Sequence, residues 1–183
     1  HAQDFYKDQR AGWLQKAEQT QPKLIETTKQ PVSLVALVKD ETVFQHWKVV
    51  PSKPVDSLYN NSFKKQSGIV VDFGEHLTGY FTFSIEELNS PADAPLRIKF
   101  TFGEVPSELA TPFDPYPGGL SRAWLQDEII TVSEVPATIT IPRRVAFRYV
   151  KMELLGSSGY SDFRISNVSF KATTSATALP AAL

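Results

Sequence analysis

The 183-residue sequence contains no cysteine, which excludes disulfide bonds, thiolate zinc sites and cysteine nucleophiles. It also has almost no net charge, because 19 basic residues are balanced by 20 acidic ones. With both signs interspersed, no extended basic surface is expected to attract nucleic acid or an anionic membrane. No apolar run approaches the roughly 20 residues that a membrane-spanning helix needs. We therefore expect neither nucleic acid nor a membrane among the partners.

Motifs for two common chemistries are absent as well. Neither glycine-rich phosphate-binding pattern, G-x-G-x-x-G or G-x-x-x-x-G-K, occurs in the chain. No serine lies in a G-x-S-x-G elbow, and the internal histidines are only His46 and His76. A nucleotide-binding protein and a serine hydrolase are therefore not predicted.

The chain is long enough for one domain with a short additional arm. Residues 4–20 contain good helix formers and no proline, which predicts a helix. The last residues are small and resemble a linker. We expect a helical arm and lead-in over residues 1–30, a single β domain over 31–171, and a linker tail over 172–183.

The remaining sequence has the period of β-strands. In the clearest case Leu96, Ile98, Phe100 and Phe102 alternate with polar residues and are predicted to share a buried face. Short apolar runs of this kind recur with turn residues between them, which is typical of two packed β-sheets. The fold class predicted is all-β, a jelly-roll or β-sandwich with a short N-terminal helical arm. The expected strands are 32–38, 43–50, 68–73, 79–85, 96–102, 128–132, 137–141, 146–155 and 163–170.

A long segment over residues 105–123 interrupts this rhythm with four prolines and a Gly-Gly pair. Long loops in compact domains are often functional. Aromatic rings can stack on the C–H face of a sugar, while charged side chains bind its hydroxyl groups. The candidate carbohydrate-binding residues are Phe113, Asp114, Tyr116, Arg122 and Trp124. Two alternatives stay open: the aromatic rings fold back onto the core, or they form an interface with another domain.

The stretch VVDFGEHLTGYFTF places Asp72, Glu75 and His76 between two apolar runs. Glycines on both sides suit a tight turn, in which Asp72 accepts hydrogen bonds from nearby backbone N–H groups. We favour this structural interpretation. The alternatives are a calcium or other metal site, and direct contact with a sugar. No cofactor is expected, with calcium as the one exception left open.

Four motifs occur in an order that resembles a known family. They are VDFGEHLTGYFTF, LRIKFTFGE, SRAWLQDEIITV after the long loop, and FRYV at Phe147–Val150. Together they resemble the N-terminal, concanavalin-like jelly-roll region of bacterial α-L-rhamnosidases over about residues 68–155. The positions that match the family's motifs include Asp72, Gly74, Gly79, Glu104, Asp127 and Arg148.

In that family hydrolysis belongs to a helical (α/α) barrel after the sandwich, and only about thirty residues follow Leu155 here. The resemblance therefore implies a non-catalytic accessory domain with no catalytic residue of its own. Its partners would be the downstream catalytic domain of the same parent protein and a rhamnose-containing oligosaccharide. We expect the parent to be a periplasmic or secreted α-L-rhamnosidase, since the chain starts at His1 with a sequence suited to signal-peptide cleavage.

Two other functions remain open at this stage. One is a stand-alone carbohydrate-binding module. The other is a small glycosidase that uses Glu104 and Asp127, since glycoside hydrolysis needs a pair of carboxyl groups. The structural alternative for these acids is an ion pair between strands, of Glu104 with Arg122 or of Asp127 with Arg148. We favour this alternative over catalysis.

Overall fold

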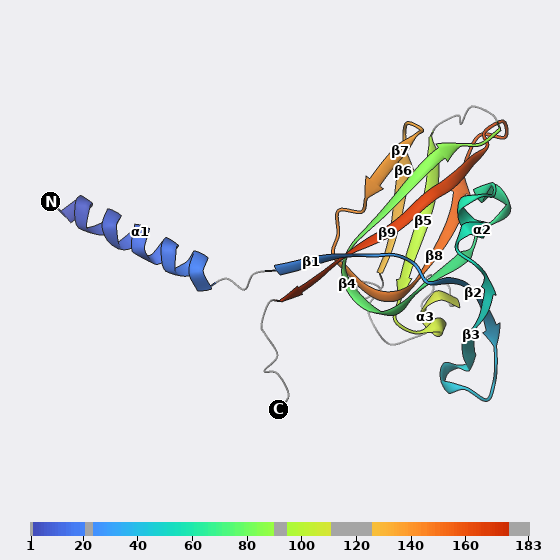
Figure 1. Ribbon diagram of the computed structural model, residues 1–183, viewed down its shortest axis with the longest axis horizontal. Coiled ribbons are helices and arrows are strands. Elements are labelled where there is room, and N and C mark those ends of the chain that lie inside the picture. The colour runs from blue at the N-terminus through green and yellow to red at the C-terminus, as the bar shows by residue number, and fades with distance from the viewer. Residues whose placement is uncertain (1, 21–23, 90–94, 111–125, 176–183) are drawn as a thin grey trace. The chain divides into compact units, whose positions relative to one another are not determined.

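The computed structural model describes residues 2–20, 24–89, 95–110 and 126–175 (Figure 1). The chain divides into two compact units, residues 1–26 with 173–183, and residues 27–172. The sequence-predicted boundaries after residues 30 and 171 stay predictions. Among the described residues, no helix is both long and apolar enough to cross a bilayer.

The smaller unit contains the predicted N-terminal helix. Helix α1 (Ala2–Thr20) covers the expected residues and leaves Trp13 and Leu14 67% and 58% exposed. Strand β1 (Leu24–Lys29) begins in this unit and was missed by the sequence analysis. Its sequence, LIETTK, is short and mixed in polarity, so its period gives little signal.

The larger unit is an all-β sandwich, as the sequence predicted. Its strands are ordered β9-β4-β8-β5-β6, with β2 pairing β3 and β4, and β7 pairing β4. Four short helical segments complete the unit: η1 (Phe44–His46), α2 (Asp56–Tyr59), η2 (Phe63–Lys65) and α3 (Pro106–Ala110). The strands of this unit are β2 (Ser33–Lys39), β3 (Trp47–Lys53), β4 (Ile69–Glu87), β5 (Leu96–Gly103), β6 (Gln126–Val132), β7 (Ala137–Thr140), β8 (Val145–Gly156) and β9 (Phe163–Ser175).

The predicted pair of strands at 68–73 and 79–85 was wrong, because these residues form one strand, β4. Strand β8 pairs with β4 on both sides of the polar stretch, at Asp72↔Tyr149 and again at Leu77↔Phe147. Residues 73–76 of β4 therefore stand opposite the single residue Arg148. The polar residues between the apolar runs therefore form a long bulge within one strand. The sequence had suggested a turn between two strands.

A second correction concerns the strand predicted at 43–50. Residues 44–46 form a 3₁₀ turn in which Gln45 and His46 have positive φ angles, so strand β3 begins only at Trp47. It then continues through Pro51, which was expected to end it. Proline is tolerated there because β3 pairs on one side only, with β2, among the described strands.

Strand β4 belongs to both layers of the sandwich. Before the bulge it pairs with β2 and β8, and β8 continues to β5 and β6. After the bulge it pairs with β8 again over residues 77–79, and from Gly79 onward it pairs with β9 and then β7. The strand therefore passes from the first layer to the second at Gly79, three residues after the bulge.

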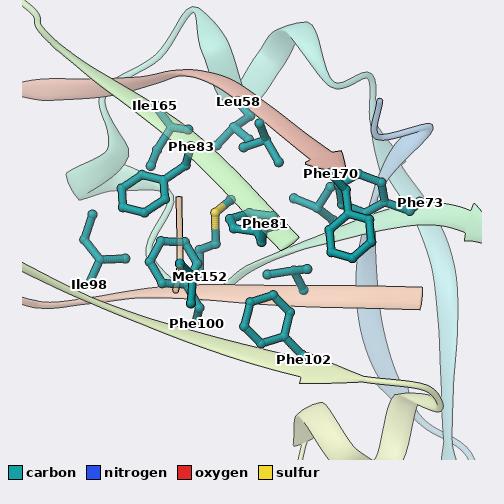
Figure 2. Close-up of a cluster of buried hydrophobic side chains, with 14 of the residues drawn as sticks. Leu58, Phe73, Phe81, Phe83, Ile98, Phe100, Phe102, Met152, Ile165 and Phe170 are labelled. Carbon is teal, nitrogen blue, oxygen red and sulfur yellow. The ribbon is translucent and has the colours of Figure 1, made fainter. Parts of the chain in front are cut away.

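Phenylalanine side chains fill the space between the layers (Figure 2). Phe83 of β4 lies 4.6 Å from Phe100 of β5, and Phe147 of β8 lies 4.6 Å from Phe170 of β9, between ring centroids. Leu96, Ile98, Phe100 and Phe102 are at most 1% exposed, which confirms the shared buried face predicted for β5. Met152 of β8 is also fully buried. Burying one such side chain contributes about 1.5–3 kcal/mol.

Gly79 lies where β4 leaves one layer for the other. It pairs with Val145 of β8 and with Ala172 of β9, and its φ angle is +155°. A Cβ atom at this position would lie 1.9 Å from the carbonyl oxygen of Lys171. The close approach of two backbones therefore requires glycine here.

We predict that Gly79→Ala destabilises the domain by about 3 kcal/mol or more, because β9 must move away from β4. Gly156→Ala is the matched control, since a Cβ atom at this strand glycine would meet nothing within 4 Å. Chemical denaturation followed by circular dichroism measures both. Equal stabilities for the two variants would contradict the close approach at Gly79.

Candidate functional site

The bulge of β4 is built around the carboxylate of Asp72. Its Oδ1 accepts a hydrogen bond from the backbone N–H of Gly74 at 2.7 Å, and Gly74 has the positive φ angle of +77° that this local turn requires. The side chain of Asp72 is only 9% exposed. The prediction that Asp72 bonds nearby backbone N–H groups is confirmed.

Arg148 of β8 completes this arrangement from the opposite strand. Its Nε donates to Asp72 Oδ1 at 3.0 Å and its Nη2 donates to Oδ2 at 3.2 Å. The guanidinium also lies over the ring of Tyr149, 5.1 Å from its centroid. The hydrogen bonds to Asp72 raise the pKa of Arg148 above its usual range, and burial raises the pKa of Tyr149. A bidentate pair of this kind fixes both strands at the bulge.

The other two polar residues of the quoted stretch have separate partners. Glu75 forms an ion pair with Lys29 at 2.9 Å, and His76 Nε2 lies 3.0 Å from Glu104 Oε1. Within the described ranges, no three Asp, Glu or His side chains form a group that could hold a metal ion. Asp72, Glu75 and His76 thus point to three different partners, and this geometry favours the structural interpretation.

Helix α3 holds Tyr149 in place from the end of β5. Its Leu109 is 2% exposed and packs with Tyr149, Val35 and Val70 in a second apolar cluster that is separate from the main core. The Leu109 carbonyl accepts a hydrogen bond from Lys151 Nζ at 3.2 Å. Because Tyr149 carries the Arg148 guanidinium on its ring, the packing of α3 supports the ion pair at the bulge.

The same end of the sandwich carries further ionisable side chains. Glu108 of α3 is partly buried. The pKa of its carboxyl is raised mainly by this burial and to a smaller extent by the negative charge of nearby Glu104. We call Asp72, His76, Glu104, Arg148 and Tyr149 the bulge cluster. Strands β4 and β8 contribute to it, and Glu104 directly follows β5, whose Gly103 pairs with Tyr149.

Three of the motif positions are not members of this cluster: Gly74, whose N–H bonds Asp72, and two that lie elsewhere. Gly79 is the layer-switching glycine described above, and Asp127 lies on β6 opposite Thr101. The carbonyl of Asp127 accepts a hydrogen bond from Arg143 at 3.3 Å. The suggested ion pair between Asp127 and Arg148 is wrong, because Arg148 bonds Asp72. The Asp72–Arg148 pair could not be predicted from a local pattern, since 76 residues separate its members.

The predicted carbohydrate-binding residues Phe113, Asp114, Tyr116, Arg122 and Trp124 lie outside the described residues. They stay predictions, as does the pairing of Glu104 with Arg122. The described chain stops at Ala110, the last residue of α3, and resumes at Gln126, which pairs with Phe102. The long segment therefore departs from the helix that packs on Tyr149.

Comparison with known proteins identifies the class of domain. Residues 31–172 match the family described as the glycosyl hydrolase family 78 alpha-rhamnosidase N-terminal domain. The match covers most of the chain, so the chain belongs to this family. The resemblance seen in the four sequence motifs is confirmed.

A solved structure shows the same relationship. A rhamnosidase from Klebsiella oxytoca with rhamnose bound is 33% identical to this chain, with a TM-score of 0.82 over 92% of this chain and 33% of that one. A family 78 rhamnosidase of a Bacillus species is 19% identical, with a TM-score of 0.42 over 60% of this chain and 10% of that one. No curated relative matches the chain. The chain thus spans about a third of the length of the Klebsiella rhamnosidase.

We predict that Arg148→Met costs about 2 kcal/mol of folding stability, because it leaves the buried Asp72 carboxylate without its charged partner. A double-mutant cycle with Asp72→Asn should give a coupling energy of about 1–3 kcal/mol. Arg144→Met, at an exposed position nearby, is the control and should change stability by less than about 0.5 kcal/mol. Denaturant unfolding measures all four variants. Additive effects of the two cluster substitutions would show that the pair does not couple the strands.

Proposed function

We propose that this chain is the non-catalytic N-terminal sandwich of an α-L-rhamnosidase-type glycoside hydrolase, and that it braces the catalytic domain of its parent protein. One observation carries the proposal. The chain corresponds closely to a third of a rhamnosidase that was solved with rhamnose bound, with a TM-score of 0.82 and 33% identity. The remainder of such an enzyme provides the surface that this domain would contact.

The charges around the bulge support a bracing role. The side chains of Glu75, His76 and Glu104 are 53%, 52% and 46% exposed, and Lys29 adds a positive charge beside Glu75. Interfaces between domains of one chain are more polar than obligate subunit interfaces. The rigid ion pair of Asp72 and Arg148 beneath this surface would keep it in a fixed shape, which is what a bracing contact needs.

Catalysis by Glu104 and Asp127 is the weaker alternative. Hydrolysis of a glycosidic bond requires two carboxyl groups that face the same substrate. Here Glu104 is paired with His76, while Asp127 lies on β6 opposite Thr101. Their surroundings resemble those of structural residues, which supports a domain without its own hydrolytic centre.

Glycan binding by the long segment is the second part of the proposal. The aromatic and charged residues Phe113, Asp114, Tyr116, Arg122 and Trp124 have the side-chain chemistry that sugars require. The segment directly follows α3 in the sequence. The substrate would be a rhamnose-containing glycan, and the parent enzyme would act in the periplasm or outside the cell.

Hydrolysis of an aryl α-L-rhamnoside tests the proposal. We expect no turnover above background by this chain, and turnover by the longer gene product that contains it. Removing residues 31–172 from that product should lower its thermal midpoint and its activity, because the catalytic domain loses its brace. Turnover by the isolated chain that is abolished by Glu104→Gln would instead establish the small-glycosidase alternative.

A further inference from the structure

A pocket of about 620 Å³ lies far from the bulge cluster, on the outer surface of the layer formed by β7, β4 and β9. Ser84 and Glu86 of β4 line it, because Phe83 and Ile85 face the core and the alternate residues face outward. Ser84 is eight residues after the bulge, which corresponds to roughly 25 Å along an extended strand. The pocket is therefore separate from the surface proposed above to contact the catalytic domain.

A bulge in β9 shapes one wall of this pocket. Ser84 pairs with Asn167 while the next residue of β4, Ile85, pairs with Ile165, so Ser166 is an extra residue without a partner on β4. Bulges redirect side chains and are frequent beside binding sites. This one places Ser166 and Asn167 next to each other on the pocket lining.

An aromatic ring from α2 forms a second wall. The hydroxyl of Tyr59 accepts a hydrogen bond from the backbone N–H of Val168 at 3.3 Å and donates to its carbonyl at 3.4 Å. Burial raises the pKa of this hydroxyl, which keeps it neutral. Both bonds hold the ring at the edge of β9, and Tyr59 lines the pocket together with Pro136. The two rings provide rigid apolar surface beside the polar wall.

The polar groups of the pocket carry no net charge. Arg164 and Glu86 form an ion pair with an N–O distance of 2.5 Å, and their side chains are 34% and 47% exposed. In the part of the chain that the structure describes, the side chains of Asn60, Ser166 and Asn167 make no hydrogen bond to protein. Their amide and hydroxyl groups are therefore available to a ligand. Because the two charged residues of the lining neutralise each other, the pocket offers no unpaired charge that would attract an ion.

We propose that this pocket binds a neutral saccharide. The Tyr59 and Pro136 rings would contact the apolar C–H face of a sugar, while Asn60, Asn167 and the Arg164–Glu86 pair would bond its hydroxyl groups. The volume lies within the range of about 300–1,000 Å³ that is usual for small-ligand sites. The site goes beyond the proposed function. Only the choice of a saccharide as the ligand rests on that function, because a domain of a sugar-cleaving enzyme is exposed to saccharides.

Nuclear magnetic resonance titration of the full chain tests this assignment, with L-rhamnose and D-galactose as neutral probes and sodium sulfate as an anionic probe. We expect saturable shifts of the Asn60, Ser166 and Asn167 resonances with at least one sugar, with a Kd in the millimolar range. Arg164→Met and Asn167→Ala should each weaken binding by about tenfold or more. The matched controls are Arg97→Met and Thr131→Ala, at exposed strand positions outside the pocket, and they should not change binding.

The other outcomes overturn the assignment in distinguishable ways. If sugar shifts only resonances of residues 111–125, the pocket proposal fails and glycan binding by the long segment stands. If no resonance responds to either sugar, both glycan sites fail, while the bracing role is untouched because it is tested by the truncated longer protein. Stronger binding of sulfate than of either sugar, or sugar binding at the pocket that survives both substitutions, also contradicts a neutral-saccharide site.

Discussion

The bidentate ion pair between Asp72 and Arg148 holds the bulge of β4, three residues before Gly79, where this strand passes from one layer of the sandwich to the other. Asp72 is nearly buried, so its carboxylate depends on the guanidinium and on the Gly74 N–H for compensation of its lost hydration. With the bulge fixed in this way, the strand pairs with β2 before it, with β8 on both sides of it, and with β9 and β7 after it. Four strand pairings therefore depend on one local conformation.

This constraint also connects the core to the surface. Phe73 follows Asp72 directly and packs edge-on against Phe147, 5.3 Å between ring centroids, so the residue next to the buried charge is anchored in the aromatic core. On the other side, Arg148 and Tyr149 are supported by helix α3. The backbone beneath the exposed acids and His76 is thus held in a fixed conformation. A fixed conformation suits a surface that must fit another domain.

Much of the fold could be predicted from the sequence, because local periodicity determines which residues face the core. Strand β5 is an example: its alternating Leu, Ile and Phe residues are all buried. The single strand β4 could not be predicted, because the glycines and charged residues that form its bulge are the same types that form turns. Whether β8 pairs with one strand or two depends on long-range register, which a local pattern does not contain.

The candidate sites also contain features that the sequence could predict and features that it could not. The local hydrogen bond of Asp72 was predictable because its acceptor and donor are two residues apart. Its pairing with Arg148 joins residues far apart in the sequence, and the pocket combines side chains from α2, β4, β7 and β9, so no short motif marks either. The motif resemblance supplied the family because four patterns in order carry long-range information that no single one has.

Native-state hydrogen exchange of β4 tests most directly whether this strand joins the two layers into one structure. Amides at 69–72 and at 77–85 should exchange with the same free energy of opening and the same dependence on denaturant, because both halves unfold together. Exchange of the first half at a clearly lower free energy would show that the strand is divided at the bulge, and would contradict this account.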